Sequence, residues 1–112
     1  MQEDVKIEMR KDTLECILAC DLDHHHAKGL REKIDHALFL EKPRIVILDF
    51  SAVSFMDSSG IGLIMGRYAR MKAVGGELVV QRPNERIRRI FEMAGIERIV
   101  RIEEKGEEKH EA

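Results

Sequence analysis

The residues best suited to chemistry lie between 49 and 66, in the stretch D-F-S-A-V-S-F-M-D-S-S-G-I-G-L-I-M-G. An apolar run ends at Asp49, and Asp57-Ser58-Ser59 then opens a segment that carries three glycines. A carboxylate beside two hydroxyls at a helix start can cap the helix, take part in acid–base chemistry, or present a serine for phosphorylation. The pattern leaves three classes of protein open: a scaffold, a catalyst and a switch.

A catalytic interpretation requires Asp49 and Asp57 to act together at the carboxyl edge of a sheet, where open α/β sheets bind ligands. Asp57 is explained more simply as a helix N-cap, a role that contributes about 1 kcal/mol. The serines have neither a G-x-S-x-G nucleophile motif nor P-loop spacing around them. We therefore predict no catalytic residue, and keep as an alternative a small ligand-binding or enzymatic domain that uses Asp49 and Asp57.

Histidines and cysteines are the other candidates for chemistry. The three consecutive histidines, residues 24–26, point in different directions on a helix or strand, whereas metal ligands converge from one side. Cys16 and Cys20 lack C-x-x-C spacing and, on one strand, lie roughly 13 Å apart, beyond the ~7 Å Cα limit for a disulfide. The sequence predicts two free, buried thiols, no metal site and no cofactor.

Composition narrows the class of protein. The chain has 112 residues, 36% of them charged, and a net charge of −2, which does not suggest direct DNA binding. No apolar run approaches the ~20 residues of a membrane span, and the N-terminus lacks a signal-peptide core. We expect a cytoplasmic protein with no membrane insertion, formed by one domain over residues 1–102 and a polar, frayed tail over residues 103–112.

Hydrophobic periodicity predicts an α/β fold of order β-β-α-β-α-β-α-β. Strands are expected over 5–9, 14–20, 45–48, 78–80 and 99–102, and helices after Asp23, after Asp57 and from Pro83 to Ala94. The unbroken run at 45–48 is typical of a central strand covered on both faces. The resulting sheet is mixed and mostly parallel, with an N-terminal antiparallel hairpin and helices packed on it.

The helix after Asp57 carries glycines where alanine would be more stable. Its expected core stripe lies at Ile61, Ile64, Met65, Tyr68 and Met71. Gly62 and Gly66 fall off this stripe, beside the two serines, although an interior glycine costs about 1 kcal/mol relative to alanine. The glycines could let the helix lie close to a neighbouring strand.

We favour the other interpretation, in which the glycines keep a flat strip open for the backbone of another protein. Leu63 is then expected to project outward near Arg67 and Arg70 and to add an apolar contact. A phosphate on one of the serines would add a charge of about −1.5 to −2. The helix N-terminus tolerates an anion, whereas a docked partner would have to bury it.

The stretch S54-F-M-D-S-S-G-I-G-L-I-M-G-R-Y68 resembles the signature of STAS-domain anti-anti-sigma factors. Three further blocks are similar to those of the anti-sigma F factor antagonists within that family: L22-D-H-H25, G75-G-E-L-V-V80 and R89-I-F-E-M-A-G95. The resemblance implies a single, monomeric STAS domain. Two departures stand out: Cys20-Asp21 replaces a usual Gly-Glu pair, and the tail after Ile102 lacks the apolar stripe of a final helix.

The resemblance also implies a mechanism. The unphosphorylated protein would bind an anti-sigma factor that is a serine kinase, and so release the sporulation sigma factor. The kinase would use ATP to phosphorylate Ser58, and a serine phosphatase would restore the active form. Asp57, Ser59 and Gly60 would be the motif neighbours, while Gly62, Leu63, Gly66 and Arg67 would contact the partner.

Helical projection alone makes Ser59 slightly more exposed than Ser58. The alternative is an antagonist in the pathway of a general-stress sigma factor.

Overall fold

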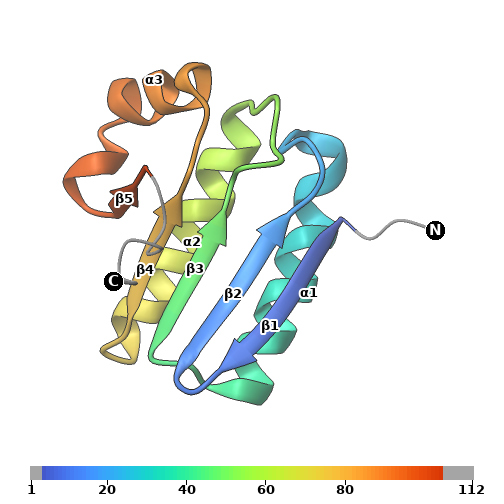
Figure 1. Cartoon of the computed structure of the whole chain (residues 1–112), viewed down its shortest axis with the longest axis vertical. Coiled ribbons are helices and arrows are strands. Elements are labelled where there is room, and N and C mark those ends of the chain that lie inside the picture. The colour runs from blue at the N-terminus through green and yellow to red at the C-terminus, as the bar shows by residue number, and fades with distance from the viewer. Residues whose placement is uncertain (1–3, 105–112) are drawn as a thin grey trace.

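The computed structural model describes residues 4–104 and contains one five-stranded sheet in the order β1-β2-β3-β4-β5 (Figure 1). Its strands are β1 (Val5–Arg10), β2 (Thr13–Leu18), β3 (Ile45–Asp49), β4 (Glu77–Gln81) and β5 (Arg101–Glu103). The helices are α1 (His24–Glu41), α2 (Ser58–Ala73) and α3 (Glu85–Ala94), with a short 3-10 turn, η1 (Ile96–Arg98). The predicted fold class and element order are confirmed.

The sheet combines one antiparallel pair with three parallel pairs. β1 and β2 form the expected hairpin, in which Val5 lies opposite Leu18. β2, β3, β4 and β5 then run parallel, each beside the strand before it in the sequence. The carboxyl ends of β2, β3 and β4 therefore meet at one edge of the sheet, and the segments that lead into α1, α2 and α3 leave from that edge (Figure 1).

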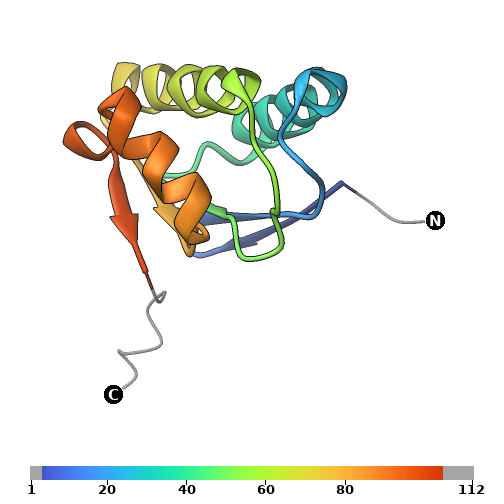
Figure 2. The ribbon, with the colours of Figure 1, turned by 90° about the horizontal axis from the view of Figure 1, so that it is seen from above.

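Helices α1 and α2 cover the same face of the sheet (Figure 2). The expectation that β3 is covered on both faces is wrong, because Ile45 and Ile47 stay only partly buried and no helix of residues 4–104 packs over them. Each right-handed crossover here advances in the same direction across the sheet, which places successive helices on one side. A sheet covered on both faces requires the strand order to reverse.

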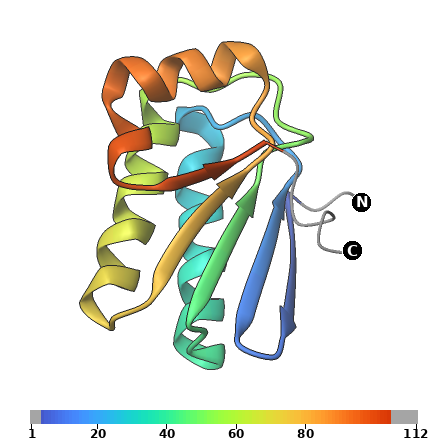
Figure 3. The same cartoon turned by 60° about the vertical axis from the view of Figure 1, so that its left-hand side comes forward.

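The core lies between the sheet and these two helices. Strand residues that face the helices are fully buried, as Leu14, Leu18, Val46 and Leu48 show. α3 lies across the carboxyl end of the sheet (Figure 3), where Phe91 contacts Phe50 edge to face with ring centroids 5.5 Å apart. Both rings are completely buried, so this pair anchors α3 to the end of β3.

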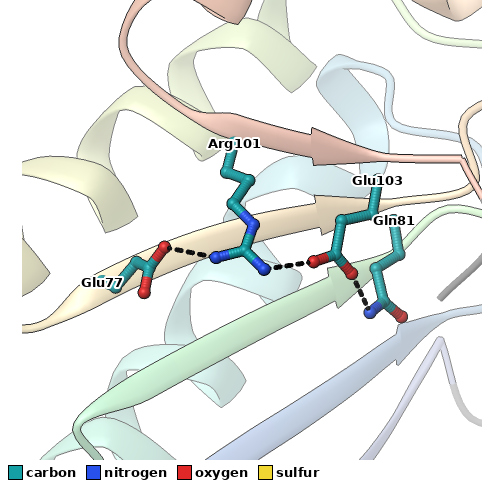
Figure 4. Close-up of polar contacts among 4 residues, drawn as sticks. All are labelled: Glu77, Gln81, Arg101 and Glu103. Atoms are coloured by element: carbon teal, nitrogen blue, oxygen red, sulfur yellow. Dashed lines mark hydrogen bonds and ion pairs between the residues drawn. The ribbon is translucent and has the colours of Figure 1, made fainter. Parts of the chain in front are cut away.

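β5 is tied to β4 by side chains on the open face of the sheet. Arg101 contacts Glu77 at 3.3 Å and Glu103 at 2.8 Å, and Gln81 donates to Glu103 at 2.8 Å (Figure 4). The last strand begins later than expected, since Ile99 is exposed, and it extends to Glu103. The frayed tail was predicted over 103–112, but Glu103 belongs to β5. Residues 105–112, and with them any final helix, lie outside the described residues.

The helix boundaries follow from capping. The N-cap of α1 is Asp23, whose side chain accepts a hydrogen bond from the His26 amide. The N-cap of α3 is Asn84, whose side chain accepts one from the Ile87 amide. Gly95 ends α3 in the left-handed conformation at φ 75°. Within residues 4–104, none of the helices has the length and apolar character that crossing a membrane requires.

The aromatic contact between α3 and β3 gives a first prediction. Phe91→Ala should lower the free energy of unfolding by about 3–5 kcal/mol, because it leaves a large cavity in the core. Met93 lies on the same helix with 84% of its surface exposed, so Met93→Ala should change stability by less than about 0.5 kcal/mol. Urea unfolding measures both. Equal effects of the two substitutions would contradict this account of how α3 is held.

Candidate functional site

The loop from Phe50 to Asp57 delivers the two serines to the start of α2, next to the start of α1. Leu22 pairs with Met56 in an isolated parallel bridge. The Leu22 amide donates to Phe55 O at 3.0 Å, and the Asp57 amide donates to Leu22 O at 3.1 Å. These bonds fix the start of α2 against the segment that precedes α1, so the serines occupy a defined position rather than a free loop.

Asp57 is the N-cap of α2, as the sequence predicts. Its side-chain Oδ1 accepts a hydrogen bond of 2.8 Å from the Ser59 amide. Ser58, the first residue of the helix, is exposed, whereas Ser59 is half-buried. Helical projection predicted that Ser59 is slightly more exposed than Ser58. This prediction is wrong, because Ser59 faces α1 and Ser58 does not.

A groove runs between α1 and α2 beside the serines. Its volume is about 580 Å³. The lining residues come from the first half of each helix: His24, Ala27, Lys28, Arg31, Ser59, Gly62, Leu63, Gly66 and Arg67. The groove thus contains five of the motif and contact residues expected from the sequence.

The glycines of α2 serve two different purposes. A Cβ atom built on Gly62 or Gly66 meets nothing within 4 Å, so packing inside the described part of the chain does not require glycine at either position. A Cβ on Gly60 would lie 2.3 Å from Met56 Cγ and 3.1 Å from Leu22 Cβ. Gly60 is buried, and its contribution is the close approach of α2 to the Leu22–Met56 bridge rather than contact with a partner.

Leu63 and Arg67 correct a sequence prediction. Leu63 was expected to project outward near Arg67, and both were expected to contact a partner, but the two residues are only 4% and 5% exposed. Helical projection assumes that a helix buries one face against the sheet, whereas α2 also packs sideways against α1. The two side chains form the floor of the groove, and a partner would meet their exposed atoms only at its bottom.

Arg67 is held in the floor by Asp35 of α1. Arg67 Nε lies 2.9 Å from Asp35 Oδ1, and Nη2 donates to Oδ2 at 3.3 Å. The Nε–Oδ1 contact is an ion pair with poor hydrogen-bond alignment, so Nη2 supplies the directional bond. Arg70 also lies 3.4 Å from Asp35. Burial lowers the pKa of Arg67, and the Asp35 carboxylate opposes that effect.

The residues that α1 contributes to the groove, which form its α1 wall, were not predicted from the sequence. His24, Ala27, Lys28 and Arg31 recur at intervals of three and four residues, as side chains on one helical face do. That spacing was visible in the sequence. The spacing indicates a groove only once α1 is known to pack beside α2, because that face of α1 could equally have been exposed to solvent.

A family model described as the STAS domain matches residues 5–109. An anti-sigma F factor antagonist from Lysinibacillus sphaericus is 35% identical over 86 residues, covering 77% of this chain and 74% of the relative. The chain belongs to the STAS-domain anti-sigma factor antagonists. This family is regulatory and non-catalytic.

Other members bear on the fold and the pathway. The solved structure of the antagonist SpoIIAA in its unphosphorylated form is 32% identical, covers 94% of this chain and 92% of its own, and has a TM-score of 0.74. The phosphorylated form of SpoIIAA from Bacillus gives the same TM-score and identity, covering 96% of each chain. An anti-sigma-B factor antagonist from Bacillus subtilis is 29% identical, covering 96% of each chain.

In this antagonist both carboxylates of the alternative catalytic site have structural roles. Asp49 is 2% exposed, and it accepts hydrogen bonds from the Ser51 amide at 2.8 Å and from Arg82 at 2.9 Å. Asp57 caps α2, and neither carboxylate lines the groove. Both cysteines are free; Cys16 is buried, as expected, while Cys20 is half-buried.

The two kinds of glycine should respond in opposite ways to alanine. Gly60→Ala should lower the free energy of unfolding by about 1–3 kcal/mol, because the new methyl group collides with Met56. Gly62→Ala should raise it by about 0.5–1 kcal/mol, since alanine is the better helix former and the site is open. Chemical unfolding tests both. A stabilising Gly60→Ala would refute the assignment of Gly60 to packing.

The ion pair in the groove floor gives a double-mutant test. Asp35→Ala should destabilise the protein by about 3 kcal/mol, because it leaves the Arg67 charge buried without a partner. Adding Arg67→Met should recover most of that loss. A thermodynamic cycle of the two single variants and the double variant measures the coupling. Additive effects would show that the pair does not hold α1 against α2.

Proposed function

We propose that this antagonist binds an anti-sigma factor that is also a serine kinase, and thereby releases the sigma factor which that kinase held. The kinase then uses ATP to phosphorylate Ser58, which ends the interaction, and a serine phosphatase regenerates the binding form. The observation that carries the proposal is the position of Ser58. It is exposed and held at the first position of α2, next to Ser59, which lines the groove together with Gly62 and Gly66.

The groove suits the backbone of a partner. Among residues 4–104, nothing fills the space that a side chain at Gly62 or Gly66 would take, so another protein can approach the surface of α2 closely there. Leu63 supplies apolar floor, while Lys28 and Arg31 form a basic wall on α1. This arrangement favours a partner segment that carries small or apolar residues and at least one acidic side chain.

A phosphate on Ser58 would affect the partner more than the fold. Ser58 is the first residue of α2, where the positive end of the helix dipole favours an anion, although the Asp57 carboxylate already accepts from the Ser59 amide. The exposed position keeps the phosphate hydrated. A docked partner would have to remove that water from a dianion, and a loss of about 3 kcal/mol weakens binding more than a hundredfold.

The proposed pathway is that of the sporulation sigma factor, sigma F. It is supported by the 35% and 32% identities to anti-sigma F factor antagonists from Lysinibacillus sphaericus and Paenibacillus polymyxa, against 29% to an anti-sigma-B factor antagonist. A general-stress pathway is the second candidate, and a sporulation or a stress operon around the gene distinguishes them. In either pathway the protein acts as a cytoplasmic monomer without contacting DNA, because its partner is the anti-sigma factor.

The switch is tested with the purified kinase. Phosphopeptide mapping after incubation with kinase and ATP should place the phosphate on Ser58. Ser58→Ala should bind the kinase like the unmodified protein and accept no phosphate, because the groove stays intact. Ser58→Asp should bind at least tenfold more weakly in calorimetry, since the added charge lies next to Ser59, which lines the groove.

Ser54→Asp is the matched control. Ser54 is an exposed serine of the loop before α2. Neither Ser54 nor its chain neighbours line the groove, whereas Ser58 adjoins the lining residue Ser59, so the same added charge at Ser54 should leave binding unchanged. Phosphate on Ser59, or equal loss of binding from the two aspartate variants, would overturn the assignment of Ser58.

A further inference from the structure

Three metal-ligating side chains from separate segments meet beside the start of α1. Asp4 precedes β1, Cys20 follows β2, and His26 lies in the first turn of α1. One ligand atom from each lies within 4.8 Å of the other two, and all three residues are half-buried. The Ala19 amide donates to Asp4 O at 2.7 Å, which holds the segments of Asp4 and Cys20 side by side.

A fourth residue orients the histidine. His26 Nδ1 lies 2.8 Å from Asp23 Oδ1, and the Nδ1–H tautomer donates this hydrogen bond. Nε2 then carries the lone pair that a metal needs. A carboxylate bonded to the second ring nitrogen is the usual support of a metal-binding histidine.

We propose that Asp4, Cys20 and His26 bind a divalent transition-metal ion of the zinc class, with Asp23 as the positioning residue for His26. One sulfur, one imidazole and one carboxylate are ligands that Zn²⁺ accepts, and three protein ligands leave a fourth, tetrahedral position for water. Bonds of about 2.0–2.3 Å separate tetrahedral ligands by roughly 3.3–3.8 Å. The three ligand atoms, which lie within 4.8 Å of one another, therefore need to close by up to about 1.5 Å.

The charges around Cys20 are consistent with a cation site. The carboxylates of Asp4, Asp23 and Asp21 lie close enough to act electrostatically on Cys20, with Lys33 acting in the opposite sense. Zn²⁺ binding would break the S–H bond, release the proton to solvent and form a sulfur–metal bond. The three carboxylates attract the cation.

This site differs from the one excluded on sequence grounds. Consecutive histidines cannot converge on a metal, and His26 alone belongs to this cluster. The other two ligands come from the ends of neighbouring strands, which the hairpin brings together. Spacing motifs such as C-x-x-C do not detect such a site, because each ligand lies on a different element.

The test is calorimetric titration of the untagged, metal-free full chain with Zn²⁺. One site is expected, with affinity at least tenfold lower in Cys20→Ala, His26→Gln and Asp4→Asn. Asp23→Asn keeps the helix cap but cannot accept from His26 in the same way as a carboxylate, so a loss of about tenfold is expected. His25→Gln is the matched control, because His25 is the exposed neighbour outside the cluster.

Cobalt provides a second readout that does not depend on comparing affinities. Co²⁺ should give a thiolate-to-metal charge-transfer band in the wild-type protein and lose it in Cys20→Ala, in which Cys16 remains. Circular dichroism establishes that each variant is folded. Absence of Zn²⁺ binding, binding unaffected by Cys20→Ala, or a cobalt complex without thiolate absorption would each overturn the proposal.

Discussion

The functional surface depends on a short backbone bridge between Leu22 and Met56. Two hydrogen bonds, from Leu22 to Phe55 O and from Asp57 to Leu22 O, join the segment before α1 to the segment before α2. Because Gly60 has no side chain, α2 can lie directly against this bridge. The starts of the two helices are thereby held together, and the position of Ser58 relative to α1 follows from that contact.

The groove combines a rigid floor with an open edge. Leu63 and the Arg67–Asp35 ion pair fill the space between the helices, so the floor is part of the protein's own packing. Gly62 and Gly66 lie above it, and no atom of the described part of the chain comes within 4 Å of a Cβ added at either position. Glycine at these two positions makes α2 less stable than alanine would. That cost is understandable if the open edge serves to bind a second protein.

Much of this structure was accessible from the sequence. Strand alternation, helix caps and the crossover rule predict the element order, and the cap at Asp57 follows from the residue type alone. Helical projection failed for Leu63, Arg67 and the order of the two serines, because it treats each helix as packed only on the sheet. The lateral contact with α1 is a tertiary feature that periodicity within α2 does not encode.

The same limit explains the other differences. The β-branched run of β3 predicts burial on both faces, yet the direction of successive crossovers decides which face receives helices. The cluster of Asp4, Cys20 and His26 likewise depends on the pairing of β1 with β2. Local pattern identifies the elements, whereas the identity of their neighbours determines which side chains converge.

The arrangement also explains how docking and modification can oppose each other. Ser58 and the groove belong to the same helix start, so in the proposed function a kinase that docks in the groove would find the hydroxyl at a fixed place and lose little entropy in ordering it. Phosphoryl transfer to Ser58 would then put a dianion beside the contact that positioned the substrate. We therefore propose that the product binds more weakly than the substrate, because the added charge changes the partner's desolvation cost far more than the stability of the domain.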